Sequence, residues 1–291
     1  MLANGIYIKI NQILLKYDEM NEVHMKSLEK LLHNASEFLC DVTEISSKWV
    51  QDLQVEKSRE IVNYHPLSGG HMLRPLLVYL TACASKRNLH EETRKQLVYF
   101  AAAVELMHNA SLLHDDLLDH EEIRRGKPCV SQAYGYKNAL LGGNIYYIKA
   151  IELSNHYLES SQTADLLKAA IAMCEGEILQ AQYEMEEIPV DVYEKIIRYK
   201  TGSLTALACR QAAAILQEEA NTVNNFGKLG EELGVMYQLR DDRKDRDVIL
   251  DTHFVYTASF DLCHIRILSI LEQMSITQNI EQFEELVAYF S

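Results

Sequence analysis

The sequence is poor in the two residues that most often interrupt helices. It holds four Pro and twelve Gly, together 16 of 291 residues or roughly 5%, against about 12% in average proteins. Hydrophobic residues make up 48% of the chain, and no stretch alternates convincingly as a strand. These features predict an all-helical protein. Because no segment resembles an interdomain linker, we expect one domain over residues 1–291.

The chain also lacks an excess of positive charge. Its formal net charge is −14, so no basic stripe is available to neutralise a nucleic-acid backbone, which argues against nucleic acid as a partner. The six cysteines show neither metal-type spacing nor the density of a disulfide scaffold. They therefore indicate reduced thiols in a cytoplasmic protein.

A hydrophobic run long enough to span a bilayer is missing as well, so we expect no transmembrane segment. The first ten residues lack the basic region and the small-residue cleavage site of a signal peptide. Ile6, Ile10, Ile13 and Tyr17 fall at helical spacing, which favours a helix packed on the body of the protein. A loose contact with a membrane surface is the alternative.

Helical periods cover most of the chain. The expected helices run over about 5–17, 22–47, 73–85, 91–119, 136–158, 163–186, 190–217, 221–245, 260–273 and 279–290. The main breaks lie at 65–70, at 125–128, at the glycine pair 142–143 and at Pro189.

Two acidic clusters end predicted helices, and each has the pattern Asp-Asp-x-x-Asp. They are Asp115, Asp116 and Asp119, and Asp241, Asp242 and Asp245. The first and last aspartates of a cluster are four positions apart, so they share a helix face. One such cluster could be a solvated face, but two that follow apolar helices favour shared counter-ions. Because hard divalent cations take oxygen ligands, usually with a phosphate, the pair predicts a magnesium–diphosphate site between two helices.

Three short motifs could bind anions, and each has an ordinary explanation when taken alone. The Gly-Gly pair at 69–70 precedes a helix start, where exposed amides could hold an anion, but such a pair is usually only a turn. The arginine pair 124–125 suits phosphate clamping, or charge compensation of nearby acids. Lys-Thr-Gly at 200–202 interrupts a helical run, and its lysine could simply be a surface residue.

Taken in order, seven stretches resemble the trans-isoprenyl diphosphate synthase family. They are Gly-Gly-x-x-Leu-Arg-Pro (69–75), Val-Glu-Leu-Met-His (104–108), His-Asp-Asp-Leu-Leu-Asp (114–119), Arg-Arg-Gly-Lys-Pro (124–128), Glu-Gly-Glu-Ile-Leu-Gln (175–180), Lys-Thr-Gly-Ser-Leu (200–204) and Gln-Leu-Arg-Asp-Asp-Arg-Lys-Asp (238–245). Each is modest alone, but the ordered set is highly specific. The resemblance implies antiparallel helices around a deep apolar cavity, with both aspartate clusters at its mouth, and a homodimer.

The resemblance also implies a role for each motif residue. Magnesium, as three ions together with the substrate diphosphate, would be bound by Asp115, Asp119 and Asp241, with Asp116, Asp242 and Asp245 in support. The allylic diphosphate would be held by Arg124, Lys200, Thr201 and Gln238. Isopentenyl diphosphate would be bound around Gly70, His71, Arg74, His108 and Arg125.

The implied activity is condensation of an allylic prenyl diphosphate with isopentenyl diphosphate to give a longer trans-polyprenyl diphosphate. Metal ions and basic side chains stabilise the leaving diphosphate, and an apolar cavity keeps the carbocation from water. No nucleophilic side chain is needed for this chemistry, and no Ser-His-Asp or Cys-His arrangement points to one.

Product length depends on the bulk of the cavity wall just before the first cluster. Ala110 and Ser111 stand five and four positions before Asp115, and both are small. They leave the tunnel open, which favours products of twenty carbons or more. Met107 is one residue that could still form a floor.

Several departures from the family pattern concern the second substrate. The Gly-Gly turn is normally followed by Lys-Arg, whereas this chain has His71-Met72, and a neutral histidine does not supply a fixed charge. Asn144 stands where aspartate is usual. The stretch 246–254 lacks the usual lid lysine, and only 46 residues follow Asp245, which predicts a shortened lid.

Three functions therefore stay open. The first is an elongating prenyltransferase. The second is a class I terpene synthase of the same fold, or a variant that prenylates another acceptor. The third is a regulatory subunit of a heteromeric prenyl synthase, against which the two intact aspartate clusters argue.

Overall fold

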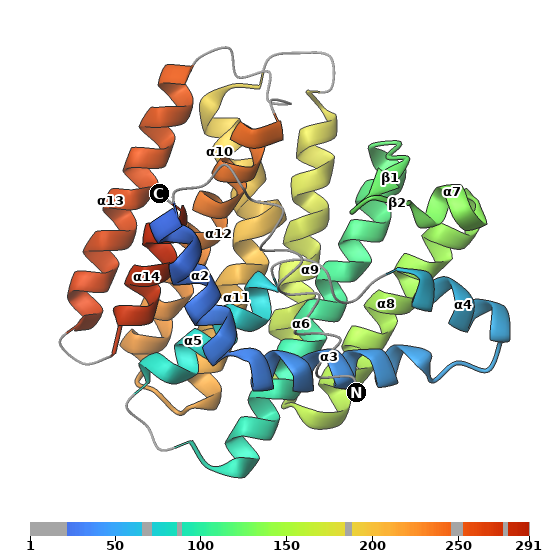
Figure 1. Ribbon diagram of the computed structural model, residues 1–291, viewed down its shortest axis with the longest axis horizontal. Helices are drawn as coiled ribbons and strands as arrows, with labels where there is room; N and C mark the ends of the chain where they lie inside the picture. Colours follow the sequence, from blue (N-terminus) through green and yellow to red (C-terminus); the bar gives the residue numbers. More distant parts are fainter. Residues whose placement is uncertain are drawn as a thin grey trace. The chain divides into compact units, whose positions relative to one another are not determined.

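The structure is a computed structural model that describes residues 22–65, 72–85, 89–183, 188–245, 253–275 and 279–290. These residues are almost entirely helical (Figure 1), which confirms the predicted all-α fold. The helices are α2 (Glu22–Asn34), α3 (Ser36–Gln51), α4 (Glu56–Tyr64), α5 (Leu73–Ala84), α6 (Glu91–Leu118), α7 (Val130–Tyr134), α8 (Tyr136–Tyr157), α9 (Ser160–Ala181), α10 (Val190–Ile197), the π-helix η1 (Arg198–Gly202), α11 (Ser203–Ile215), α12 (Ala220–Asp245), α13 (His253–Ser275) and α14 (Glu281–Phe290). None of these helices is long and apolar enough to cross a membrane.

The chain forms two compact units, which are described separately. The first consists mainly of Leu32–Leu76 and Arg94–Thr163, and the second of Leu77–Thr93 and Ala164–Ser291 together with Asn21–Leu31. The expectation of one domain over 1–291 stays a prediction.

In the first unit, α3, α4, α7 and α8 pack against one another (Figure 1). The hydroxyl of Tyr146 in α8 donates a hydrogen bond to the carbonyl of Val62 in α4, at 2.8 Å. Residues 100–107 in the central part of α6 are all buried, and all but Glu105 are apolar. A helix that is buried on all sides is a core helix, so α6 forms a rigid support for the residues at its C-terminal end.

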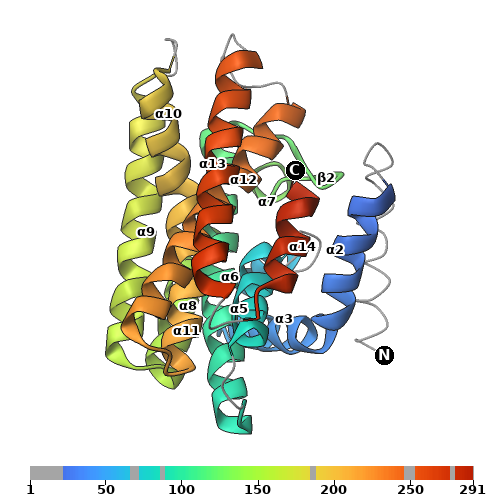
Figure 2. The same ribbon diagram turned by 90° about the vertical axis from the view of Figure 1, so that its left-hand side faces the viewer.

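In the second unit, α11 and α12 approach each other closely because α12 carries glycines on the facing side. A Cβ on Gly230 would lie 2.4 Å from the carbonyl oxygen of Thr205, and one on Gly234 would lie 2.1 Å from Thr205 Oγ1. Gly230 and Gly234 are one turn apart, so they share a face. Helices α13 and α14 also pack on α12 (Figure 2).

Several predicted boundaries were wrong. The expected helix 22–47 is two helices, α2 and α3, which meet at Ala35. The expected helix 190–217 is split by η1 into α10 and α11. Helices α4 and α7 and a two-stranded hairpin, β1 (Ile123–Arg124) with β2 (Lys127–Pro128), were not expected. These elements are too short to produce a periodic signal. The predicted helix 5–17 lies outside the described residues.

Candidate active site

The first aspartate cluster ends α6. The backbone N–H of Asp119 donates to the carbonyl of Asp115 at 2.8 Å, so the helical turn continues and the two side chains share one face. Asp115 is half-buried and Asp119 is exposed. Helix C-termini carry partial negative charge, to which these carboxylates add. This end of α6 is therefore a site that attracts cations.

Asp116 has a different environment, because its side chain points into the protein and is only 3% exposed. Arg124 in β1 donates a hydrogen bond from Nε to Asp116 Oδ1. Burial raises the pKa of the Cys129 thiol to about 11, and the neighbouring Asp116 carboxylate contributes to that shift. The side chain of Asp116 thus fastens the hairpin to α6, while Asp115 and Asp119 form the more accessible pair.

A tight turn orients the two arginines of the hairpin. Ile123 pairs with Pro128 and Arg124 with Lys127, so Arg125 and Gly126 form a two-residue loop. Both loop residues have positive φ, 51° for Arg125 and 75° for Gly126. This combination is typical of a type I′ hairpin turn. Arg125 pays a conformational cost there, because left-handed backbone suits Gly or Asn better than Arg.

A chain of buried hydrogen bonds lies along α6 before the cluster. Asn109 donates from Nδ2 to Glu105 Oε1 at 3.2 Å and to the Glu105 carbonyl at 2.8 Å. His65 lies 3.0 Å from Asn109 Oδ1 through its Nε2, and because an amide oxygen only accepts, His65 is the donor. Burial is the main cause that lowers the pKa of His65 to about 4 and raises the pKa of Glu105.

The charges of three arginines help to lower the pKa of His108 in this region. Burial is the main cause of a pKa of His108 well below its ordinary value, and the charges of Arg74, Arg125 and Arg124 lower it further. His108 is therefore neutral, and its Nδ1 is buried without a hydrogen-bond partner among the described residues. The first unit thus holds three arginines whose charges act on His108, which lies on the helix whose end carries Asp115.

His114, the residue before the first cluster, contacts α8 closely. Its Nε2 lies 3.3 Å from the carbonyl oxygen of Leu140, and its ring centroid lies 5.4 Å from that of Tyr147. A Cβ on Gly143 would lie 2.3 Å from His114 Nε2, so the ring occupies space that only glycine leaves open. The contact fixes the register of α6 against α8 beside the aspartates.

The second aspartate cluster ends α12 in the second unit. Gln238 donates from Nε2 to Asp242 Oδ1 at 2.7 Å, and its own Oε1 accepts from Thr201 Oγ1 at 2.8 Å. The hydroxyl of Tyr193 donates to Asp242 Oδ2. Asp242 is thus held on both carboxylate oxygens. Asp241 is close enough to Tyr289 for its charge to raise the pKa of that phenol, although burial is the main cause.

Lys200 lies in η1 and is held from α9. Its Nζ is 2.6 Å from Glu177 Oε1 and 2.8 Å from Gln180 Oε1. A Cβ on Gly176 would lie 2.8 Å from Lys200 Cγ, so the lack of a side chain at Gly176 leaves room for the Lys200 side chain. Glu177 and Gln180 thus give the Lys200 side chain a defined position.

Of the remaining predicted residues, Ala110, Met107 and Ser111 are described by the structure, and the others are not. Ala110 and Met107 are fully buried and Ser111 is half-buried, with its hydroxyl donating to the His108 carbonyl at 2.9 Å. Gly70, His71 and the side chain of Asp245 lie outside what the structure describes.

The polyprenyl synthetase profile matches residues 55–282, most of the chain. This chain belongs to the polyprenyl synthetase family. A short chain isoprenyl diphosphate synthase of Methanocaldococcus jannaschii is 32% identical over 185 residues, which cover 61% of this chain and 54% of that protein. A geranylfarnesyl diphosphate synthase of Methanosarcina mazei is 34% identical over 184 residues, which cover 63% and 60%.

Solved structures agree with the family assignment. An isoprenoid synthase family member from Thermotoga neapolitana superposes with a TM-score of 0.71 at 28% identity, covering 86% of this chain and 94% of that one. A geranylgeranyl pyrophosphate synthetase from Pyrococcus horikoshii gives 0.75 at 21% identity and supports the fold alone. In sequence, the chain spans between about half and two thirds of the length of the curated relatives that it matches.

The carboxylates of this polyprenyl synthetase fit magnesium in their donor chemistry. Within the described part of the chain, no group of three or more His, Cys, Asp or Glu side chains forms a metal cage. Magnesium usually keeps several waters and binds through one or two carboxylates plus substrate phosphates. Asp115 and Asp119 on one helix face supply such a pair of oxygen donors in the first unit, and Asp241 and Asp242 are the carboxylates of the second unit's cluster.

The sequence did not reveal several residues whose side chains bind the predicted site residues and fix their positions. Tyr193, Glu177 and Gln180 fix Asp242 and Lys200, and His65 joins the buried chain through Asn109. Glu177 and Gln180 lay inside the family motif 175–180, at helical spacing, so the motif held the signal. Tyr193 and His65 carried no signal, because their partners are 49 and 44 residues away.

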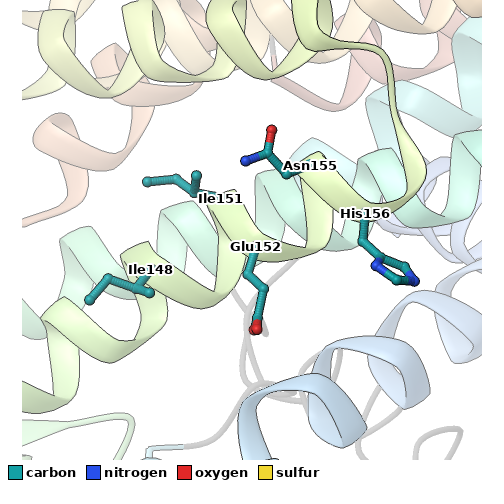
Figure 3. Close-up of a pocket in the computed structure, with 5 residues that line it drawn as sticks. All are labelled: Ile148, Ile151, Glu152, Asn155 and His156. Atoms are coloured by element: carbon teal, nitrogen blue, oxygen red, sulfur yellow. The ribbon is translucent and has the colours of Figure 1, made fainter.

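An open groove of about 440 Å³ lies elsewhere in the first unit, along α8. It is lined by Ile148, Ile151, Glu152, Asn155 and His156. Figure 3 shows that Glu152 and His156 point to one side of the helix, and Ile151 and Asn155 to the other. None of these residues belongs to an aspartate cluster, so this groove is the outer face of a helix and no part of the candidate active site.

Proposed function

We propose that this chain is a magnesium-dependent prenyltransferase. It ionises an allylic prenyl diphosphate and condenses the allylic cation with isopentenyl diphosphate to give a longer trans-polyprenyl diphosphate. The observation that carries the proposal is the match of residues 55–282 to the polyprenyl synthetase family, together with the accessible pair Asp115 and Asp119 at the end of α6. Arg74, Arg124 and Arg125, in the same unit, are side chains of the kind that binds a diphosphate.

The first step breaks the allylic carbon–oxygen bond. Asp115, Asp119 and Asp241 would hold magnesium, which would supply Lewis-acid stabilisation of the leaving diphosphate. Lys200 adds a fixed ammonium, positioned by Glu177 and Gln180, and Arg124 adds a guanidinium. Thr201 and Gln238 complete the allylic diphosphate set, joined by their own hydrogen bond. Asp116, Asp242 and Asp245 support these ligands.

The second step forms the new carbon–carbon bond. Arg74, His108 and Arg125, with Gly70 and His71, bind isopentenyl diphosphate so that its double bond attacks the allylic cation. A proton is then lost, and the departing diphosphate is its acceptor. No side-chain nucleophile takes part, so the residues act by charge and position alone.

We propose a product of twenty carbons or more. Ala110 and Ser111 are small and leave space beside the first cluster. Met107, which is fully buried, lies about one turn nearer the N-terminus of α6. Similar proteins are named geranylgeranyl and geranylfarnesyl diphosphate synthases. One similar protein is named farnesyl diphosphate synthase, so product analysis is needed to fix the length.

A terpene synthase, or transfer to another acceptor, is favoured by one observation. Met72, at a position where the family usually has a cation, is 7% exposed, and its sulfur accepts from Thr43 Oγ1 at 3.7 Å. Met72 thus serves as a core residue and supplies no charge for isopentenyl diphosphate.

We also propose a homodimer in the cytoplasm. Leu141 (48% exposed) and Ile148 (63% exposed) lie on the outer face of α8. Exposure of these apolar side chains to water is unfavourable, and a second copy of the chain would cover them. None of the six cysteines forms a disulfide, and reduced thiols are usual in the cytoplasm. Sedimentation of the wild type and of Ile148→Glu tests the dimer, since the charged variant should be monomeric.

Product analysis tests the activity. The purified chain is incubated with magnesium and allylic diphosphates of ten, fifteen and twenty carbons, with and without isopentenyl diphosphate. The proposal expects longer diphosphates only when isopentenyl diphosphate is present. Hydrocarbons or alcohols formed without it would support the terpene synthase instead. Turnover only after addition of a second, different chain would support a regulatory subunit.

A further inference from the structure

An ion triad centred on the buried Glu232 lies in the second unit, and none of its three residues belongs to a family motif. Glu232 in α12 is 6% exposed and binds two arginines. Arg198 Nη1 lies 2.8 Å from Glu232 Oε1, and Arg266 Nε lies 3.0 Å from Glu232 Oε2. Arg198 begins η1, and Arg266 belongs to α13, which packs on α12 (Figure 2). The triad therefore joins the π-helix to two other helices.

The segment that Arg198 begins is the one that carries Lys200 and Thr201. A π-helix is rare and has fewer favourable backbone hydrogen bonds than an α-helix, so it needs support from its surroundings. Part of that support comes from Thr205, whose hydroxyl donates to the carbonyls of Thr201 and Gly202, both at 3.1 Å. Gly234 leaves the space that Thr205 occupies.

The two ends of the π-helix are thus attached to α12 by different means. At its C-terminal end, Gly202 packs so closely on α12 that an added Cβ would lie 3.3 Å from Glu231 Cγ. At its N-terminal end, Arg198 forms an ion pair with Glu232, supported by a longer contact of 3.5 Å to Glu231. The preceding helix α10 is also attached to α12, through the hydrogen bond from Tyr193 to Asp242. Thr201 lies between these attachments and reaches Gln238.

We infer that Arg198 is a positioning residue for allylic diphosphate binding. Its ion pair with Glu232 holds the start of η1 on α12, and this keeps Thr201 against Gln238 and Lys200 between Glu177 and Gln180. Gln238 in turn holds Asp242 at 2.7 Å. Arg266 neutralises the other oxygen of Glu232 and touches none of these groups. The inference deepens the proposed function and its kinetic part rests on it.

Two matched variants separate positioning from general stability. Arg198→Met removes the attachment of η1 but leaves Glu232 paired with Arg266, so no buried carboxylate is left alone. Arg266→Met makes the same chemical change on the other side of Glu232 and leaves the attachment of η1 intact. Glu232→Ala is less informative, because it removes the carboxylate that pairs with both arginines and can unfold the protein.

The first measurement is amide hydrogen exchange over residues 198–205, which does not depend on any activity. Arg198→Met should raise exchange there at least about tenfold, while Arg266→Met should leave it within about twofold of the wild type. Equal exchange in the two variants, or no increase in Arg198→Met, would overturn the inference.

The second measurement is steady-state kinetics with the allylic diphosphate. Arg198→Met should raise KM for the allylic substrate about tenfold with kcat within about twofold, and leave KM for isopentenyl diphosphate unchanged. Increased exchange without this KM change would also overturn the inference. If the wild type has no prenyltransferase activity, the proposed function fails, whereas the exchange comparison still decides whether Arg198 positions η1.

Discussion

Arg124 Nε donates to Asp116 Oδ1, and this ion pair joins the β1–β2 hairpin to the last turns of α6. We expect Arg124→Gln to lower the free energy of unfolding by roughly 2 kcal/mol. This is less than the ~3–5 kcal/mol of a fully buried pair, because the Arg124 side chain is 30% exposed. Urea denaturation measures the loss. Lys127→Gln, which removes an exposed cation from the same hairpin, should stay within about 0.5 kcal/mol, and equal losses would contradict the account.

The two glycines of α8 should respond differently to alanine. Gly143→Ala places a methyl group 2.3 Å from His114 Nε2, so the ring and the neighbouring Asp115 must shift. We expect a loss of about 1–3 kcal/mol in stability, measured by chemical denaturation. Gly142→Ala is the control, because its Cβ would meet Ile61 Cγ2 at 3.1 Å, a contact that small movements relieve. An equal or larger loss in Gly142→Ala would be evidence against close packing of His114.

At Arg125, stability and activity should change in opposite directions. Its φ of 51° suits asparagine better than arginine, so Arg125→Asn should stabilise the fold by about 0.5–1 kcal/mol. The same change removes a cation from the isopentenyl diphosphate site and should raise KM for that substrate about tenfold, or about 1.4 kcal/mol. Arg125→Lys keeps both the charge and the backbone cost and should stay near wild-type stability. A KM for isopentenyl diphosphate unchanged in Arg125→Asn would remove Arg125 from that site.

Stability should fall in mild acid because of two buried histidines. The pKa of His65 is lowered from 6.5 to about 4, mainly by burial, and that of His108 is also lowered. In the unfolded chain both protonate near their ordinary pKa. The contribution of His65 is therefore complete above about pH 6.5 and is lost as the pH falls towards 4, by on the order of 1.4 kcal/mol per pH unit in that window, and His108 adds a loss of the same sign.

The histidine prediction is tested by thermal unfolding at several pH values. His65→Asn should show a shallower fall of melting temperature between about pH 6.5 and about pH 4 than the wild type. His90→Asn, at an exposed position, should follow the wild-type curve. Parallel curves for wild type and His65→Asn would show that His65 is already protonated in the folded protein.

The sequence alone was sufficient for the fold class and for the long helices, because α6, α8 and α12 carry long stretches with helical periods. It was less reliable where local signals compete. Ala35 breaks the expected helix 22–47 without any proline or glycine, and the hairpin rests on an Arg-Gly turn that lacks the usual Asn-Gly pair. Helices as short as α7 cannot be recognised by period.

For the candidate site, motif order predicted the residue types but not their partners. The Lys-Thr-Gly interruption at 200–202 marked a real irregularity, which is the π-helix η1. The contacts that position it involve Glu177 and Glu232, and neither pairing can be inferred from spacing along the chain. Met72 shows the converse case, since a lost cation could be read from the sequence but its new role in the core could not.

We propose that both aspartate clusters bind the magnesium ions that release diphosphate from an allylic substrate. The most direct measurement is the rate of diphosphate release from farnesyl diphosphate, with and without magnesium, in the wild type, Asp115→Asn, Asp241→Asn and Glu121→Gln. We predict no release without magnesium and a loss of at least about 100-fold in each aspartate variant, with Glu121→Gln close to the wild type. Release at the wild-type rate by either aspartate variant would contradict the account.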